Sequence, residues 1–465
     1  MAVDLGPGRY AFICFITDDD GQSHAVKGMA SEFRIRYSTG RGPAWVRARH
    51  GGRDGIEMTG FRHERRATAG LAALLLATAF VSTANASTAV NTAVVRCGET
   101  LIRSTVLAAD VGPCAGDGIV VGADGITVNL NGHRVLGTPG PGDNVGIRVQ
   151  RRTRVIVSGG TVRGFGAGVA IMGGSRNIVT GVTAKDNVGL IDGSGDFGDG
   201  LAIFNSSYNI LRANTVRHNG PFDGVGVFGA SSTGNLVVGN VVELNNIARF
   251  VPQLDLMLNL DEGINLGAGL SGGSHTTVVN NTVRKNGLNG INACSIRGNP
   301  CITTDDVIVG NLVQANGFGD PLNPDPYDTG DGIHVVSIKP PGFSFSDFFP
   351  VTRELVANNT VLDNAGNGIA VGSSNNQILN NRVVGNGSGL GDVFFDLQDV
   401  SLNNDCDSNS WYGNTFVTAD PVCTTAGGHR LPAPAMTAPK ASSAAVPPRP
   451  AAPAEPPLGR RFPSF

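Results

Sequence analysis

The chain has 465 residues, of which 66 are glycine, 6% are aromatic and 16% are charged. Globular domains usually carry about a quarter charged residues, so this composition disfavours a set of conventional globular modules. Residues 87–424 include 19 basic and 29 acidic residues, a net charge of −10. Because nucleic-acid binding requires a basic surface, we expect no nucleic-acid partner, whereas sugars and divalent cations remain compatible ligands.

Residues 58–86 have the three parts of a secretory signal peptide. A basic start precedes the apolar run 71–81, and an Ala-Asn-Ala cleavage site ends at Ala86. The run of eleven apolar residues is too short to span a bilayer. We therefore expect a secreted or periplasmic protein, cleaved after Ala86, without a transmembrane segment in the mature chain. Residues 1–57 are then a non-native or disordered extension, and a cytoplasmic extension ahead of a signal anchor is the alternative.

Residues 87–137 depart from the pattern that follows, and we expect an N-terminal cap and a first coil there. Residues 138–402 repeat the phrase Asn-x-Val-x-x-Asn, which starts at residues 214, 240, 281, 311, 359 and 381. The interval from 359 to 381 is 22 residues, and the longer intervals are this period plus an insertion. Short runs rich in Val and Ile, broken by Gly and Asn at such a period, indicate strands rather than helices.

We therefore predict an all-β parallel β-helix solenoid with about nine or ten coils, whose strands stack about 4.8 Å apart. Equal positions of successive coils then form columns. Asparagine at a corner tolerates left-handed backbone geometry, and its amide can bond to the amides above and below. The alternative for Asn214, Asn240 and Asn281 is ligand binding. Two residues further on, a second column is expected to point inward: Val162, Ala184, Val216, Val242, Val283, Val313, Val361 and Val383.

The C-terminal segments differ from the repeats. Because the open end of a solenoid exposes unpaired strands, we predict a C-terminal cap over residues 403–424. Residues 425–465 are rich in proline and alanine, which predicts a disordered tail.

Six cysteines follow the signal segment, and they fall into three local pairs. Six cysteines allow 15 pairings, but an extended fold keeps distant pairs apart and favours neighbours. The absence of a Cys-x-x-Cys sequence disfavours zinc, so we expect disulfides formed in an oxidising compartment. The expected pairs are Cys97–Cys114, Cys294–Cys301 and Cys406–Cys423.

The sequence Cys-Gly-Glu-Thr at 97–100, the stretch 117–133 and the tandem Asn-x-Val-x-x-Asn turns resemble secreted right-handed parallel β-helix proteins of the pectin-lyase-like superfamily. That superfamily includes pectate lyases, polygalacturonases and alginate-lyase-like enzymes. The resemblance covers about residues 94–423 and implies the fold. It does not specify an activity, because one fold hosts many functions.

Four insertions interrupt the repeats, at 188–199, 246–262, 317–331 and 336–353. The first three occur at the same place in the unit, between the asparagine corner and the next Gly-apolar triplet. Loops at one corner of successive coils project from one side and can form the walls of a groove. Tolerated surface decoration is the alternative.

Acidic residues end these loops, and stacked neighbours would lie about 5 Å apart, a separation that suits the two carboxylates of a retaining glycosidase. Their repulsion would raise one pKa or recruit calcium, the one cofactor that we consider. Favourable Asp-Gly turn chemistry is the alternative. His334 is an acid/base candidate, with an exposed strand residue as the alternative. The candidate catalytic residues are Asp199, Asp223, Glu262, Asp331 and His334, with Asn289 and Asn367 in the same column as the acids.

A basic column, Arg163, Lys185, Arg217 and Arg284, is interrupted by Glu243. A carboxylated polysaccharide could bind to such a row, and a solvated stripe is the alternative. The candidate substrate-binding residues are Arg217, His218, Arg284 and Lys285.

Together these patterns predict a monomeric secreted protein that binds or cleaves an extracellular polysaccharide or cell-surface glycan along a loop-walled groove. If it is an enzyme, the reaction class is that of a polysaccharide lyase or a glycoside hydrolase. The alternative is a non-catalytic surface, scaffold or adhesion protein.

Overall fold

A computed structural model divides the chain into two units, Met1–Ala89 and Val90–Phe465. In the first unit, β1 (Gly8–Ile13) and β2 (Ala30–Ile35) form an antiparallel pair. The predicted signal peptide lies outside the described residues. The structure describes residues 8–13, 30–35, 91–190, 198–229, 231–246, 264–265, 274–293, 303–317, 330–336, 351–387, 394–399 and 406–432.

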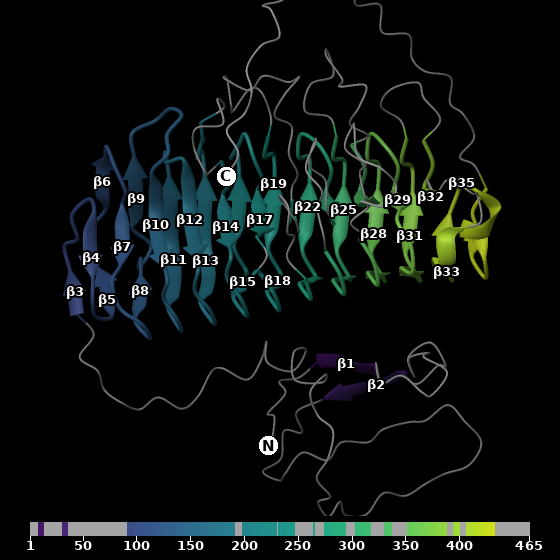
Figure 1. Ribbon diagram of the computed structural model, residues 1–465, viewed down its shortest axis with the longest axis horizontal. Helices are drawn as coiled ribbons and strands as arrows, with labels where there is room; N and C mark the ends of the chain where they lie inside the picture. Colours follow the sequence, from purple (N-terminus) through teal and green to yellow (C-terminus); the bar gives the residue numbers. More distant parts are fainter. Residues whose placement is uncertain are drawn as a thin grey trace, which may run out of the picture. The chain divides into compact units, whose positions relative to one another are not determined.

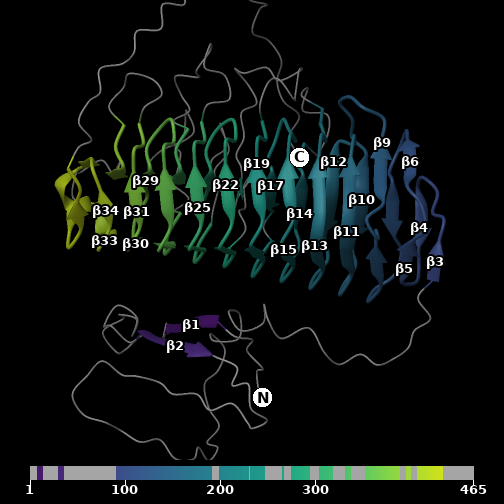
Figure 2. The same ribbon diagram turned by 180° about the vertical axis from the view of Figure 1, so that it is seen from behind.

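The second unit is a succession of short parallel strands along one axis (Figures 1 and 2). One sheet has twelve strands, each paired in parallel with the strands of the neighbouring coils. The register of these pairs confirms the predicted parallel solenoid. The strands of this sheet are β4 (Glu99–Leu101), β7 (Ile119–Val121), β10 (Val145–Gln150), β12 (Ala167–Met172), β14 (Leu201–Phe204), β17 (Val225–Phe228), β20 (Ile264–Asn265), β23 (Ile291–Asn292), β26 (Ile333–Val336), β29 (Ile369–Gly372), β32 (Leu397–Asp399) and β35 (Ala419–Asp420).

The other strands form two parallel ladders, joined because the eight-residue strands β11 (Ile156–Arg163) and β13 (Ile178–Lys185) belong to both. In later coils these long strands are replaced by two three-residue strands separated by a corner. The first ladder also contains β3 (Asn91–Ala93), β5 (Thr105–Leu107), β8 (Thr127–Asn129), β15 (Ile210–Arg212), β18 (Leu236–Val238), β21 (Thr277–Val279), β24 (Val307–Val309), β27 (Leu355–Ala357), β30 (Gln377–Leu379) and β33 (Ser410–Tyr412). The second contains β6 (Val111–Cys114), β9 (Arg134–Gly137), β16 (Thr215–Arg217), β19 (Val241–Glu243), β22 (Thr282–Arg284), β25 (Leu312–Gln314), β28 (Thr360–Leu362), β31 (Arg382–Val384), β34 (Thr415–Phe416) and β36 (His429–Arg430).

The core runs along the inside of the coils. In most three-residue strands the central side chain is buried and its neighbours are partly exposed, as the two-residue period of a strand requires. The predicted inward column is confirmed, and every member from Val162 to Val383 has an exposed fraction of 0%. A single coil could not bury these side chains, so each coil depends on its neighbours.

The repeated phrase forms two buried ladders of asparagine amides, which confirms the predicted stacking. From Asn214 to Asn414, each Nδ2 donates to the Oδ1 of the next asparagine at 3.0 Å. The second asparagine of the phrase forms a parallel ladder from Asn187 to Asn386, at 2.8 to 3.0 Å. A third ladder, which the sequence analysis missed, begins with Asn177, Asn209 and Asn235.

The backbone at these corners corrects one detail of the prediction. The left-handed conformation belongs to the residue before each ladder asparagine, for example Ala213 (φ 51°) before Asn214 and Asn280 (φ 54°) before Asn281. The ladder asparagines do not need positive φ. They are selected because an amide both accepts and donates within a buried column.

Both ends of the second unit carry a disulfide. The predicted pairs Cys97–Cys114 and Cys406–Cys423 are confirmed, whereas Cys294 and Cys301 lie outside the described residues. Strands β3 to β9, in the segment predicted as an N-terminal cap and first coil, pair within the same ladders and sheet as the repeats. Two 3-10 helices, η2 (Cys406–Ser408) and η3 (Val422–Thr425), lie at the other end.

Within the part of the chain that the structure describes, no helix is both long enough and apolar enough to cross a membrane.

Candidate functional site

The predicted acidic column lies where the chain enters the twelve-stranded sheet. Asp199 and Asp223 each precede their strand, β14 or β17, by two residues, and Asp331 precedes β26 in the same way. The strand register places all three at one corner, with Asn289 and Asn367 in the same column. Glu262 lies outside the described residues.

These side chains form a further hydrogen-bonded column. The backbone N–H of Asp223 donates to Oδ1 of Asp199 at 3.0 Å, and the N–H of Asp331 donates to Oδ1 of Asn289 at 2.7 Å. Asn367 donates its N–H and its Nδ2 to Oδ1 of Asp331, at 2.6 and 3.0 Å. The column therefore has a structural role at the corner, whatever chemistry it also supports.

Asp199 has a carboxyl group in a strongly desolvating environment. Its side chain is buried, and among the described residues Oδ2 has no hydrogen-bond partner. Burial raises the pKa of Asp199 to about 7, against the lowering effect of hydrogen bonds from the backbone of Asp223 and Gly198. A carboxyl group that titrates near neutral pH can both donate and accept a proton under physiological conditions.

Asp331 and His334 form a second candidate centre. Oδ2 of Asp331 lies 2.7 Å from Nδ1 of His334, whose side chain is 11% exposed. His334 points to the outer side of the sheet, and its paired neighbours are Asn292 on β23 and Ala370 on β29. Because the carboxylate fixes the ring through Nδ1, the Nε2 atom is left as the group that can exchange a proton.

Small, buried residues occupy the outer side of the sheet next to Asp199. In register, the outward positions on β12, β14 and β17 are Ala170, Ala202 and Gly226. A Cβ at Gly226 would lie 3.0 Å from Oδ1 of Asp199 and 2.6 Å from Cε1 of Phe228. Gly226 therefore lies between a carboxyl group and an aromatic ring.

Two aromatic rings border this strip of small residues. Phe204 ends β14 and Phe228 ends β17, with ring centroids 5.4 Å apart. Phe204 is 39% exposed, whereas Phe228 packs against an outer apolar cluster that includes Ala170 and Ala202. The sequence analysis missed Phe204, although both rings directly follow the Gly-apolar triplet of their coil.

The predicted basic column is present, but it lies on a different sheet from the acids. Strand register stacks Arg163, Lys185, Arg217, Glu243 and Arg284. Arg284 pairs with Glu243 at 2.8 Å. Glu243 therefore neutralises Arg284 within the ladder.

The corner after this column adds a further acid. The carboxylate of Asp186 lies 3.2 Å from His218, 3.6 Å from Lys185 and 3.9 Å from Arg163. Burial lowers the pKa of His218 against the raising effect of Asp186. This arrangement favours a solvated stripe, and the substrate-binding roles of Arg217, His218, Arg284 and Lys285 remain predictions.

A family model described as a right handed beta helix region matches residues 117–337. The protein is a right-handed parallel β-helix. No curated protein matches the sequence.

Several solved structures resemble this chain at low sequence identity. The Dettilon tailspike protein is 17% identical with a TM-score of 0.46, over 68% of this chain and 55% of the tailspike chain. An alginate lyase from Paenibacillus sp. is 14% identical with a TM-score of 0.38, over 70% and 90% of the two chains. Pectate lyase Pel9A is 14% identical with a TM-score of 0.38, over 66% and 71%. The β-helix protein thus spans little more than half the length of the tailspike chain.

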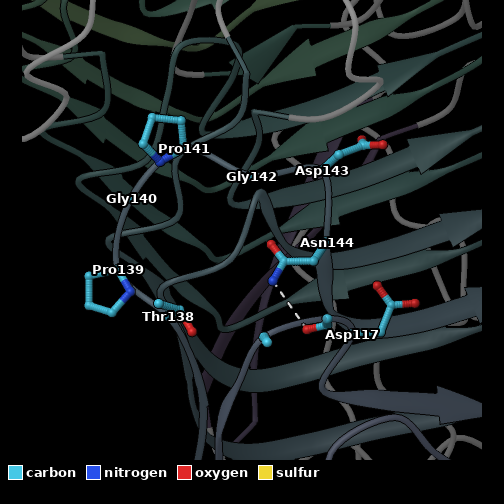
Figure 3. Close-up of a pocket in the computed structure, with 10 residues that line it drawn as sticks. Asp117, Thr138, Pro139, Gly140, Pro141, Gly142, Asp143 and Asn144 are labelled. Atoms are coloured by element: carbon cyan, nitrogen blue, oxygen red, sulfur yellow. Dashed lines mark hydrogen bonds between the residues drawn. The ribbon is translucent and has the colours of Figure 1, made fainter.

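An open depression of about 400 Å³ lies at the same border of the sheet, nearer the N-terminal end of the β-helix. Figure 3 shows the loop Thr138–Pro141 opposite Asn144 and Asp117, where Nδ2 of Asn144 donates to the carbonyl of Gly116 at 3.1 Å. The carboxylate of Asp117 pairs with Arg148 at 2.5 Å. Asp117 is three coils before Asp199 in the acidic column, so the depression is separate from the predicted acids.

Among the residues that the structure describes, no group of three or more His, Cys, Asp or Glu side chains is arranged to hold a metal ion.

Proposed function

We propose that this β-helix protein binds an extended extracellular polysaccharide along the outer side of the twelve-stranded sheet. The observation that carries the proposal is the exposed ring of Phe204, which packs near Phe228 over small, buried residues and close to buried carboxyl groups. The apolar face of an aromatic ring suits the C–H face of a sugar, and a few placed polar groups then fix its orientation.

The columns make a linear polymer a suitable ligand. Positions of equal chemistry recur once per coil, so a chain that runs along the axis meets similar groups at successive coils. On three neighbouring strands the outward residues Ala170, Ala202 and Gly226 are small and buried, and the exposed ring of Phe204 lies on the same side. The negative charge of residues 87–424 favours neutral or amino sugars over uronates.

The first test is direct binding by the purified protein to neutral, amino-sugar and uronate polysaccharides, followed by the variant Phe204→Ala. Loss of the exposed ring should weaken binding about tenfold, which corresponds to about 1.4 kcal/mol. Tyr412→Ala is the matched control, because Tyr412 is also exposed but lies on β33 in another ladder. Absence of binding to every polysaccharide, or equal affinity of Phe204→Ala and wild type, would contradict the proposal.

Cleavage of the bound polysaccharide is a second candidate function, favoured by the contact between Asp331 and His334. A histidine that is fixed through Nδ1 can act as general acid or base through Nε2, and a positioned proton donor or acceptor contributes about 10²- to 10⁴-fold in rate. His334→Gln should lower turnover by a factor in this range and change binding little.

The matched control for cleavage is His275→Gln, which alters an exposed histidine near Asp305. Product formation should be unchanged in that variant. If the wild type binds a polysaccharide and releases no product from it, the protein is the non-catalytic binding or adhesion protein of the alternative hypothesis.

We also infer that the protein is exported, with cleavage after Ala86. Two disulfides at the ends of the β-helix support this inference, because disulfides persist in oxidising compartments.

A further inference from the structure

The third asparagine ladder changes its chemistry in the middle of the β-helix. Its next rungs after Asn235 are Thr276, Asp306 and Glu354, and amides resume at Asn376. The backbone N–H of Thr276 donates to Oδ1 of Asp306 at 2.6 Å, and the N–H of Asp306 donates to Oε2 of Glu354 at 2.9 Å. The two acids therefore accept the same backbone hydrogen bonds as ladder asparagines.

A carboxylate can accept a hydrogen bond in this column, but it cannot donate one to the next side chain as the amide of an asparagine does. In the amide rungs Nδ2 donates to the next side chain, whereas an ionised carboxylate has no proton to donate. A neutral carboxylic acid has one. Asp306 and Glu354 are both fully buried, and Oε1 of Glu354 has no hydrogen-bond partner among the described residues. The buried positions of Asp306 and Glu354 therefore favour the neutral forms of both acids over two negative charges about 5 Å apart.

The charged groups around the pair do not neutralise it. Among the described residues, these are Asp305, Arg353 and His275. Arg353 donates two hydrogen bonds to Asp305, at 2.8 and 2.7 Å, and His275 lies 3.6 Å from the same carboxylate. The described residues form no salt bridge with Asp306 or Glu354, and the charge of Arg353 has only a small lowering effect on the pKa of Glu354.

Burial has the expected effect on both acids. It raises the pKa of Asp306 to about 8, although the hydroxyl of Thr303 also donates to this carboxyl group. Burial, and then the charge of Asp306, raise the pKa of Glu354 well above its ordinary value.

The position of the pair connects it to the candidate site. Asp306 and Glu354 are equivalent positions of successive coils, and β24, β25 and β26, with Asp331 and His334, lie between them in the sequence. The bond between Asp306 and Glu354 joins residues 48 positions apart, whereas the next rung joins residues 22 apart. The hydrogen bond from the N–H of Asp306 to Glu354 thus joins the corner before β24 to the same corner of the next coil, and His334 lies between these two corners in the sequence.

We propose that Asp306 and Glu354 form an acid latch, which closes this coil while the two side chains are neutral and loosens it when they lose a proton. The latch itself is independent of ligand binding.

The direction of the pH dependence follows from the raised pKa values. In the open coil the acids ionise near their ordinary pKa of about 4, but in the closed coil Asp306 ionises near 8. Opening therefore releases protons between these pH values, so the closed coil loses stability as the pH rises from about 4 to about 8. The opening equilibrium should increase about tenfold per pH unit for each proton released.

Hydrogen exchange measured on the full chain between pH 5 and 9 tests the latch. After correction for the intrinsic exchange rate, protection of β24 and β26 should fall with rising pH up to about pH 8, about tenfold per unit for one proton. Strands β10 and β12, several coils away, should show no such slope. In the double variant Asp306→Asn/Glu354→Gln, the amides restore the ladder and protection should become independent of pH.

Asp305→Asn is the matched control, because it removes a neighbouring, partly exposed acid and leaves the ladder intact; the slope should persist. If the double variant does not fold, Asp306→Asn alone should reduce the slope.

Protection that is constant with pH in the wild type, or a wild-type slope in the folded double variant, would overturn the proposal. So would recovery of protection at pH 9 on addition of calcium, which would assign the acids to a cation. Failure of every polysaccharide to bind would overturn the proposed function and leave the latch intact.

Discussion

A single asparagine amide meets several demands at once in a buried corner. Oδ1 of Asn281 accepts hydrogen bonds from the backbone and from Nδ2 of Asn240, at 2.9 and 3.0 Å. Its own Nδ2 donates to Asn311 at 3.0 Å and to the carbonyl of Val237 at 2.9 Å. Because buried polar groups without a partner are costly, the neighbours of each ladder asparagine depend on it as strongly as it depends on them.

Replacing Asn281 with alanine should destabilise the protein by about 2–4 kcal/mol, because the backbone N–H and Nδ2 of Asn240 lose a shared acceptor and the carbonyl of Val237 loses a donor in a buried column. Chemical denaturation of the variant and the wild type measures the difference. Gln377→Ala is the matched control, since Gln377 is exposed on β30 and should change the free energy of unfolding little. An Asn281→Ala variant as stable as the control would contradict a structural role for the ladder.

At the scale of the strand and its corner, the repeat period was enough to predict most of the strands and the columns of stacked residues. The regular spacing of Val216 and its counterparts predicted both the strands and the inward column, because stacking places equal positions over one another. The acidic and basic columns followed from the same spacing and are present. The spacing did not predict which ion pairs these charged residues form. The pairing of Arg284 with Glu243 depends on side-chain conformation, which a repeat pattern does not specify.

The elements that the sequence analysis missed have a common physical reason. The third ladder contains Thr276, Asp306 and Glu354, so its column is not a run of identical residues and no repeated letter marks it. Phe204 lies just after its triplet, at a position that is aromatic in few coils. The raised pKa of Asp199 was not predicted either. It results from burial by atoms that come together only in the folded chain.

At the scale of the whole β-helix, stability is approximately a sum over coils and their interfaces. Each coil adds one strand to the twelve-stranded sheet and one rung or more to the ladders, so the fold tolerates insertions between rungs without loss of register. The disulfides lie in the first and last described coils, where a coil has a neighbour on one side only. The surface that results is long and repetitive, as a polymer ligand requires.

The crystal structure of the protein with a bound oligosaccharide, chosen from the polysaccharides that it retains in solution, tests the central claim most directly. We expect sugar rings against the outer side of β12, β14 and β17, with one ring in contact with Phe204. A ligand on the basic column of β16, β19 and β22, or in the depression beside Asn144, would contradict it.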